Sequence, residues 1–401
     1  MKLLLITYYF PPCGGAAVQR WLRFIKALHQ KNVQVTIITT EDGDYPHTDP
    51  SLLDSIPEGT KVLRSKPFGF SRLWKALGQK ELPYGSLQNQ AEDTRLKKLL
   101  YWLRLNLVVP DMRIGWNRSA YQLAKHELMS DIYDYVLTTG PPHSTHLIGL
   151  KLKQHYPIQW RADFRDPWSE IYYLKLNPPS RLTMLCHKYL ESRVLAEADM
   201  CYVVSKSIAD ALPKGNKTVL YNGFDPDDFS DLTYQRSSAF RIKYVGQLTA
   251  GQDISPLLRA ISSLPELENL EFSLIGTAAI PKVDFDIRQK PFLPHHQALE
   301  ELVNAELLVL IINNYEGNKG MLTTKLFEYI ASRTPILCIA PPGGEAEEVI
   351  VKTQSGVVLQ TGEQIAHYLS NLYIQWQGRM DIRSSGAIDL YNVHKQVEKL
   401  V

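Results

Sequence analysis

The sequence predicts an α/β protein with two doubly wound parallel sheets. Three features lead to this prediction. Short apolar runs alternate with amphipathic stretches of helical spacing along most of the chain. The chain has 401 residues, which is enough for two domains that each bury a full core. A polar segment at residues 226–238 interrupts the alternation, and a fresh strand pattern begins at Phe240.

The alternation also suggests how the chain is divided. We expect a first domain over residues 1–204, a second over residues 205–380, and a C-terminal helix over residues 381–401 that packs back on the first domain. Two α/β domains of similar size imply a cleft between them, and small molecules bind in such clefts.

Composition narrows the class of protein. Lys and Arg number 44 against 42 Asp and Glu, so the overall charge gives no indication of nucleic-acid binding. The N-terminal apolar run is too short for a secretory signal, and no run approaches the length of a membrane span. Four scattered cysteines lack metal-ligand spacing, as is typical of buried thiols in a reducing compartment. We therefore expect a cytoplasmic protein.

The N-terminal segment has the pattern that opens a doubly wound sheet. Strand, loop, helix and strand are predicted over residues 2–8, 11–15, 16–30 and 33–39. The loop ends in Gly14 and Gly15, whose backbone can approach a phosphate or sugar closely. We favour ligand contact here because such sheets bind ligands at the carboxyl ends of their strands. The pair is not part of a G-x-G-x-x-G motif, and a plain tight turn is the alternative.

A basic and aromatic segment begins at Arg95. Its sequence, RLKKLLYWLRL, places leucines on one side of a helix and Lys97, Lys98 and Arg104 on or near the other. Such a helix can lie on the anionic inner face of the membrane, with aromatic side chains at Tyr101 and Trp102 in the interface. A second basic and aromatic segment, residues 72–80, precedes it. The alternative, favoured for any single helix of this kind, is ordinary packing on the sheet.

Polar side chains follow two strands of the first domain. A strand at residues 135–139 leads into His143, and a strand at residues 158–162 leads into Asp163, Arg165 and Asp166. Parallel strands end at one edge of a sheet, so we expect these side chains to converge with the glycine pair. His146, by contrast, leads into a helix and is expected to be a structural histidine. A cap before Pro167 is the alternative role for Asp166.

The strongest pattern for ligand binding lies in the second domain. An apolar run at residues 307–312 predicts a strand, which a glycine-bearing loop at residues 313–320 connects to a helix. Thr323 or Thr324 is expected to be the N-cap of that helix. Free backbone N–H groups and the positive end of the helix dipole meet at such a point, so anions bind there.

Two charged residues mark this helix. Lys325 and Glu328 share one face, opposite the apolar pairs Leu326 with Ile330 and Phe327 with Ala331. A lysine in the first turn opposes the dipole by up to about 1 kcal/mol, and a bound diphosphate would convert that cost into an attraction. Glu328 would then accept hydrogen bonds from two ribose hydroxyls. An exposed ion pair worth about 0.3 kcal/mol is the alternative, and these residues alone leave both interpretations open.

With these motifs in order, the chain resembles family 4 glycosyltransferases of the GT-B fold over nearly its whole length. The resemblance rests on the residue 8–15 opening, TTGPPHSTH, RADFRDPW, VLYNGFD and KYVGQL. It rests above all on TTKLFEYIASRTPIL, which is similar to a segment of bacterial polysaccharide and cell-wall sugar transferases. Each motif is moderately specific, and their order along one chain is strongly so.

The resemblance implies a nucleotide-diphosphate sugar held by the second domain and a glycan or lipid-linked acceptor held by the first. Transfer would retain the anomeric configuration, and no cofactor is implied beyond the donor substrate. We find no Asp-x-Asp metal-binding loop, because the Asp225–Asp228 run lies in the linker and is expected to be a solvated turn, so we predict transfer without a metal. The catalytic candidates are Lys325 for the leaving group and Asp166, Asp163 and His143 for the acceptor. The expected donor contacts are Gly14, Gly15, Gly246, Gln247, Leu293, Gly320, Thr324, Lys325, Leu326 and Glu328.

The sequence departs from the family pattern at three positions. Gln247 stands where an arginine is common, and Gln252 stands where a lysine is common. Gly320 occupies the position of the first of two glutamates, of which Glu328 keeps the second. Each lost charge-assisted contact is worth about 1.5 to 3 kcal/mol, so either Lys325, the helix dipole and Arg165 or Lys319 supply the missing diphosphate binding, or the donor binds weakly.

Two other functions stay open. Nucleotide-sugar 2-epimerases share the two-domain shape, and His143 with Asp163 imitates the residue set they need. A non-catalytic nucleotide-sugar-binding protein is the other alternative, because of Gln247 and Gln252.

Overall fold

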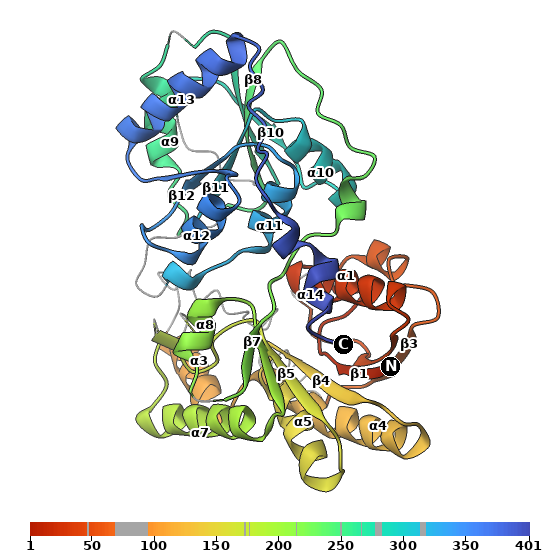
Figure 1. Ribbon diagram of the computed structural model, residues 1–401. Coiled ribbons are helices and arrows are strands. Elements are labelled where there is room, and N and C mark those ends of the chain that lie inside the picture. The colour runs from red at the N-terminus through yellow and green to blue at the C-terminus, as the bar shows by residue number, and fades with distance from the viewer. Residues whose placement is uncertain are drawn as a thin grey trace. The chain divides into compact units, whose positions relative to one another are not determined.

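The computed structural model describes residues 1–45, 48–68, 95–171, 174–175, 177–213, 215–248, 251–265, 267–276, 283–312 and 318–401 (Figure 1). The chain forms two compact units. Unit 1 comprises Met1–Tyr221 together with Val397–Val401, and unit 2 comprises Asn222–Gln396. The basic segment at residues 72–80 and most of the loop at residues 313–317 lie outside the described residues.

The described part of unit 1 contains a parallel sheet with the strand order β3-β2-β1-β4-β5-β6-β7. Its strands are β1 (Lys2–Ile6), β2 (Gln34–Thr40), β3 (Lys61–Ser65), β4 (Tyr135–Gly140), β5 (Trp160–Phe164), β6 (Met200–Val203) and β7 (Lys217–Val219). Its helices are α1 (Ala16–Gln30), α3 (Arg95–Leu107), α4 (Asn117–Ser130), α5 (Ser144–His155), α7 (Arg181–Glu197) and α8 (Lys206–Ala211), with 3-10 turns η1 (Pro50–Leu53) and η3 (Met112–Trp116). Figure 1 shows α4, α5 and α7 along one face of this sheet.

The strand order of unit 1 explains where a ligand would bind. The central strands β1 and β4 are buried on both faces, which fits the apolar residues of β1 and of the first half of β4; β4 ends in the buried Thr138 and Thr139. The chain order reverses between β1 and β4, and doubly wound sheets bind ligands at such a switch point. The loop with Gly14 and Gly15 follows β1, and His143 follows β4.

Unit 1 extends beyond residue 204, where we expected the first domain to end. The strand β7 pairs in parallel with β6, from Cys201 and Lys217 to Val203 and Val219. The helix α8 between them, capped by the Ser205 hydroxyl, also packs on β6 and β7. The chain therefore leaves this unit only after Tyr221.

Unit 2 repeats the architecture with the strand order β10-β9-β8-β11-β12-β13 among the described residues, again all parallel. Its strands are β8 (Phe240–Val245), β9 (Leu270–Ile275), β10 (Ile287–Lys290), β11 (Leu307–Ile311), β12 (Ile336–Ile339) and β13 (Gly356–Leu359). Its helices are α9 (Ser255–Ser262), α10 (His295–Val303), α11 (Thr324–Ala331), α12 (Glu345–Lys352), α13 (Gly362–Gln377) and α14 (Val393–Val397), with 3-10 turns η4 (Pro226–Phe229), η5 (Asn318–Gly320) and η6 (Asp389–Tyr391).

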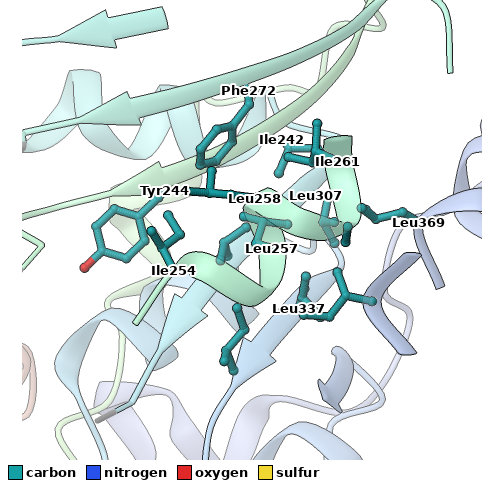
Figure 2. Packing of buried hydrophobic residues seen from close by; sticks show 14 of the residues in the cluster. Ile242, Tyr244, Ile254, Leu257, Leu258, Ile261, Phe272, Leu307, Leu337 and Leu369 are labelled. Carbon is teal, nitrogen blue, oxygen red and sulfur yellow. The ribbon is translucent and has the colours of Figure 1, made fainter. Parts of the chain in front are cut away.

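The core of unit 2 lies between its sheet and the packed pair α9 and α13. Figure 2 shows Leu257 and Leu258 of α9 beside the strand residues Ile242 and Phe272, with Leu369 of α13 nearby. All five side chains are buried. The switch point of this sheet lies between β8 and β11, and the segments that follow those two strands carry Gly246 and α11.

The expected C-terminal helix over residues 381–401 is wrong in extent. The helix is α14 alone, and the preceding segment is irregular chain with the 3-10 turn η6, held in place by hydrogen bonds within unit 2. Ser384 N–H donates to the Arg333 carbonyl, and a Cβ on Gly386 would lie 1.8 Å from the Thr353 oxygen. The chain at Gly386 is thus too close to the neighbouring backbone for any side chain. Glycine also destabilises a helix, so this position favours irregular chain. The packing on unit 1 is made by the last residues, since the Leu400 carbonyl accepts from Tyr135 and Arg161.

A buried ion pair holds α1 against the carboxyl ends of the central strands in unit 1. Arg20 Nη2 lies 3.0 Å from Asp163 Oδ1, and neither side chain is more than 1 % exposed. Thr139 Oγ1 donates to the other Asp163 oxygen at 2.7 Å, and Trp21 Nε1 donates to Thr139. Arg20 also donates to the carbonyl of Leu220, which lies at the end of the segment Met1–Tyr221 of unit 1. Every member of this network has a partner, as a buried charge requires.

We predict that Asp163→Asn destabilises the protein by about 3 to 5 kcal/mol, because Arg20 then stays buried without a counter-charge. Urea unfolding followed by tryptophan fluorescence measures this loss. Glu398→Gln is the matched control, because the Lys31–Glu398 pair is half-exposed and worth at most about 1 kcal/mol. Equal unfolding midpoints for the two variants would show that the buried pair does not stabilise unit 1.

Candidate active site

The best-developed site in unit 2 surrounds the first turn of α11. The helix begins at Thr324, and Thr323 is its N-cap residue, although the Thr323 side chain makes no capping hydrogen bond. Leu326, Phe327, Tyr329 and Ile330 are buried, whereas Lys325 and Glu328 are half-buried on another side. Ala331 was expected on the buried face but is half-buried, whereas Tyr329, which was not expected there, is buried.

The Lys325 ammonium lies against Tyr244 at the end of β8. Its Nζ donates to Tyr244 Oη at 3.2 Å and lies 4.7 Å from the ring centroid, a cation–π distance. Gly246 makes room for it, because a Cβ there would lie 2.3 Å from Lys325 Nζ. Gly246 also has φ +116°, a backbone conformation that glycine adopts without strain. The expected donor residue Gly246 therefore fixes where the lysine goes.

Lys325 has few compensating contacts for a charge that is largely withdrawn from water. Burial lowers its pKa to about 8, with Glu328 acting in the opposite direction. The position in the first helical turn adds repulsion from the dipole. A charged group held at such a cost is typical of functional sites, where a ligand rather than the fold supplies the counter-charge.

Glu328 has a histidine partner from a different helix. Its Oε1 lies 3.3 Å from His295 Nε2, and His295 is the first residue of α10. The carboxylate is only 16 % exposed, so His295 limits the directions it can take. The carboxylate therefore has a defined position one turn along α11 from Lys325.

The two glutamines that replace family cations take part in the same network. Gln252 Nε2 donates to the Ile311 carbonyl at 2.9 Å, and its Oε1 accepts from Tyr244 Oη at 3.3 Å. Tyr244 Oη also donates to the Gln247 carbonyl at 3.0 Å, while the Gln247 side chain is exposed. Gln252 thus orients Tyr244, the partner of Lys325, and brings no charge of its own.

The other expected donor residues have these positions within unit 2. Gly320 ends η5 just before α11, Leu326 is buried in the core, and Leu293 is half-buried ahead of α10. Thr324 is half-buried in the first turn of α11. The burial of Leu326 leaves its backbone as the part that a ligand can contact.

In unit 1, His143 is a buried polar residue whose ring nitrogens lack hydrogen-bond partners among the described residues. Its ring stacks on Trp168 at 5.1 Å and 5°, and the Trp168 indole donates to His187. His143 is 4 % exposed, and within the described parts of the chain neither ring nitrogen has a hydrogen-bond partner. Burial, with His146 and Arg165 adding to it, holds the pKa of His143 well below its usual range. The imidazole is therefore neutral, with one nitrogen able to donate and one able to accept.

His146 is structural, as expected. Its Nδ1 lies 3.0 Å from Thr138 Oγ1, its ring stacks on Phe164, and burial lowers its pKa to about 3.

The acidic candidates of unit 1 separate into two environments. Asp163 is committed to Arg20 and Thr139, an arrangement that favours a structural role over a catalytic one. Asp166 is half-exposed, and burial raises its pKa while Arg165 lowers it. Arg165 donates to the Gly140 carbonyl at 3.2 Å and to the Pro141 carbonyl, so it orders the loop before His143. Asp166 thus remains the carboxyl that can take or give a proton here.

The glycine pair lies at the start of α1. Gly14 is buried, and Gly15 is exposed with φ +104° and no atom within 4 Å of where a Cβ would be. Gly15 is the N-cap residue of α1, which has no side-chain cap. The first N–H groups of α1 are therefore reachable from the free space beside Gly15.

The Asp225–Asp228 run was expected to be a solvated turn, but one of its aspartates is buried. Asp225 is buried, caps η4 and lies with Asp227 and His394 in a group whose ligand atoms are within 4.8 Å of one another. No other such group occurs among the described residues. It sits where α14 begins, away from the α11 site in sequence.

Tyr244, His295 and Trp168 are the residues of these sites that sequence reasoning did not identify. Tyr244 lies inside β8, where its sequence gives no indication of a functional hydroxyl. His295 begins α10, and its partner Glu328 is 33 residues away along the chain. Trp168 was part of a quoted motif, but its stacking on His143 depends on tertiary structure.

We predict that Lys325→Met stabilises the protein at neutral pH by about 1 to 3 kcal/mol, because the pKa of Lys325 falls from 10.5 unfolded to about 8 folded. The cost of the charge is complete below pH 8 and disappears as the pH rises towards 10.5, so the gain should shrink over that window. Thermal unfolding at pH 7 and pH 10 measures it, with the exposed Lys319→Met as control. A loss of stability at pH 7 would contradict the strained-lysine interpretation.

Among the described helices, none combines the length and the apolar character that a membrane span requires.

Neither a protein-family model nor a curated protein matches the chain. Solved structures do match it over its full length. A sucrose-phosphate synthase from Thermosynechococcus elongatus has a TM-score of 0.61 at 12 % identity, covering 100 % of this chain and 98 % of its own. The Anabaena protein HepE in complex with UDP-glucose has a TM-score of 0.60 at 12 % identity, with coverage of 100 % and 98 %.

A third match is a candidate UDP-N-acetylglucosamine 2-epimerase from Listeria monocytogenes, with a TM-score of 0.56 at 11 % identity and coverage of 100 % and 94 %. At these identities the likeness concerns the fold. Together with the two parallel α/β sheets, it shows that the chain has the GT-B fold.

Proposed function

We propose that the protein is a glycosyltransferase that moves a hexosyl group from a nucleoside-diphosphate sugar to a hydroxyl of a glycan or lipid-linked acceptor. The proposal rests mainly on Lys325, a strained cation at the N-terminus of α11 that lacks a full counter-charge. A diphosphate supplies that counter-charge and also accepts hydrogen bonds from the free N–H groups of the helix. The GT-B fold is the scaffold on which the HepE protein binds UDP-glucose.

Each donor-side residue has a role in this proposal. Lys325 and the first N–H groups of α11 bind the diphosphate, and Glu328, oriented by His295, accepts the two ribose hydroxyls. In line with the family resemblance, we propose that the half-buried Leu293 and the exposed Phe292 lie near the base. As the sugar leaves, negative charge develops on the diphosphate, and Lys325 is already desolvated and positioned to stabilise it.

The acceptor-side roles belong to unit 1. Neutral His143 offers a donor and an acceptor to a sugar hydroxyl, and Asp166 has the raised pKa that suits proton exchange. Asp163 instead keeps α1 and the Gly14–Gly15 loop in place through Arg20. In line with the family resemblance, we propose a retaining reaction without a metal, in which the donor phosphate itself accepts the acceptor proton.

The epimerase alternative keeps its support because the Listeria protein has the same fold over the same length. The engagement of Asp163 with Arg20 weakens it, since the pair His143 and Asp163 was the imitation of an epimerase site. Incubation with UDP-sugars, with and without acceptor glycans, separates the two. New epimer without acceptor favours the epimerase, and donor consumption only in the presence of acceptor favours the transferase.

We expect the protein to bind UDP or another nucleoside diphosphate, and Lys325→Ala to weaken this binding by about ten- to a hundredfold. The reason is the loss of a charge-assisted contact worth about 1.5 to 3 kcal/mol. Calorimetry with UDP, GDP, ADP and TDP measures it. Glu328→Gln should lower the affinity for nucleoside diphosphates and leave the affinity for inorganic diphosphate unchanged. The exposed Lys352→Ala, in the last turn of α12, is the control. No binding by any nucleotide at millimolar concentration would favour a non-catalytic protein of another kind.

Binding should also depend on pH in a direction set by Lys325. Its pKa near 8 means that the free protein loses this charge as the pH rises through 8, so diphosphate affinity should fall between pH 7 and pH 9. Lys325→Arg keeps the charge over this range and should flatten the profile. A wild-type affinity that is constant from pH 7 to pH 9 would exclude Lys325 as the diphosphate ligand.

A further inference from the structure

Arg165 is a half-buried cation that forms no ion pair among the described residues. It directly follows β5, and β5 lies beside β4 in the sheet of unit 1 (Figure 1). Its Nε donates to the Gly140 carbonyl at 3.2 Å, and its Nη2 donates to the Pro141 carbonyl. Burial lowers the pKa of Arg165, while Asp163 and Asp166 act in the opposite direction. The charge is therefore held at a cost that carbonyl oxygens only partly offset.

Neither of the two acids that act on Arg165 is committed to it. Asp163 lies 3.0 Å from Arg20 and accepts from Thr139, so both of its oxygens are engaged elsewhere. Burial raises the pKa of Asp166, although Arg165 lowers it. A guanidinium carries more N–H groups than two carbonyls can use. Arg165 therefore has hydrogen-bonding capacity left for another acceptor.

Arg165 lies where the ends of several strands meet. Its charge acts against the burial that raises the pKa of Cys13 to about 12, and it adds to the lowering of the pKa of His143 and of His146. Cys13 precedes Gly14 in the loop after β1, and His143 follows β4. The chain order of the sheet reverses between β1 and β4, so Arg165 lies at the point where such sheets bind ligands.

Two further groups at this edge of the sheet can bind an anion. The helix α1 begins there with Gly15 as an N-cap residue that provides no side-chain cap, and its first turn has no acidic residue. A Cβ on Gly15 would meet no atom within 4 Å, so the first N–H groups of α1 adjoin open space. Both ring nitrogens of the buried His143 lack a hydrogen-bond partner among the described residues. A guanidinium, a helix N-terminus and a free imidazole are all groups that bind oxyanions.

We propose that unit 1 binds an oxyanion, a phosphate or a carboxylate, between Arg165 and the N-terminus of α1. The anion is part of the acceptor, which is thus a phosphorylated or acidic glycan or lipid-linked sugar; this assignment rests on the proposed transferase function, whereas the anion site itself does not. The acceptor is favoured because Arg165 adjoins Asp166 and His143, while the donor diphosphate has Lys325 and α11. The donor diphosphate is the other source of the same chemistry.

Inorganic phosphate is the probe for the anion site. Thermal unfolding of the full chain at increasing phosphate concentration, against sodium chloride of equal ionic strength, gives its affinity. The Lys325→Ala variant is the background, because it weakens the anion site at α11. Phosphate should bind in this background, and added Arg165→Gln should lower the affinity at least about tenfold through the loss of a charge-assisted contact.

Arg165→Lys, in the same background, separates anion binding from a structural role. It keeps the charge, so it should lower the phosphate affinity less than Arg165→Gln does. Both variants lose the guanidinium contacts to the loop at residues 140–141. Equal losses of phosphate affinity would therefore show that Arg165 only orders this loop, and would overturn the proposal.

Arg161→Gln is the matched control. Arg161 is also half-buried and also donates to a backbone carbonyl, that of Leu400, but it lies near the amino end of β5. Its variant should bind phosphate as the background does, and circular dichroism should show all variants folded. No phosphate binding in the background, or equal phosphate binding by the Arg165→Gln and Arg161→Gln variants, would rule out the anion site.

Calorimetry with UDP, on Arg165→Gln with Lys325 intact, separates the two sources of the anion. An unchanged UDP affinity is expected and leaves the acceptor as the source. A UDP affinity lowered about tenfold or more would overturn that assignment and give Arg165 to the donor diphosphate. Phosphate binding at Arg165 without any nucleotide binding would contradict the proposed transferase and support the anion site, whereas UDP binding without phosphate binding would do the reverse.

Discussion

The placement of one lysine charge at a helix N-terminus is the constraint around which unit 2 is arranged. Lys325 is held by Tyr244 through a hydrogen bond and a cation–π contact, and Gly246 leaves the space that its ammonium occupies. Tyr244 is in turn held by Gln252, which is anchored to the end of β11. The fold thus keeps a desolvated cation next to the free N–H groups of α11, a geometry that is unfavourable alone and favourable with a bound anion. Stability is given up locally for pre-organisation, as at many functional sites.

In unit 1, by contrast with Lys325, two buried charges are fully paired. Arg20 and Asp163 satisfy each other, with Thr139 and the Leu220 carbonyl completing the network. Both ring nitrogens of His143, which is neutral and stacked on Trp168, are without a hydrogen-bond partner among the described residues. The contrast separates two kinds of group: the paired carboxylate of Asp163 is structural, whereas the His143 imidazole has free hydrogen-bonding capacity.

The replacement of two family cations by Gln247 and Gln252 changes how the site is built. The Gln252 side chain accepts a hydrogen bond from Tyr244 and donates one to the carbonyl at the end of β11. It therefore orients Tyr244, whereas a lysine at this position would add a positive charge. The Gln247 side chain is exposed, and its backbone carbonyl is the part that joins the network. A single well-placed cation with a lowered pKa is the physical consequence, and it makes ligand affinity unusually sensitive to pH.

The alternation of strands and helices, the glycine loops at both switch points, and the position of Lys325 and Glu328 on one helix could be predicted from the sequence, because these depend on local periodicity and spacing. The predicted bounds of α1 agree with those observed, and the start of α11 agrees to within one residue. The sequence did not predict β3, β10 or β13, whose short sequences lack a strong apolar signal, or the irregular chain and 3-10 turn over residues 381–392. Contacts in the folded chain show that Tyr244 and His295 orient the charged pair and that Asp163 is committed to Arg20. These facts join residues tens to hundreds of positions apart, and the burial and partners of a side chain depend on such contacts, which no local pattern contains.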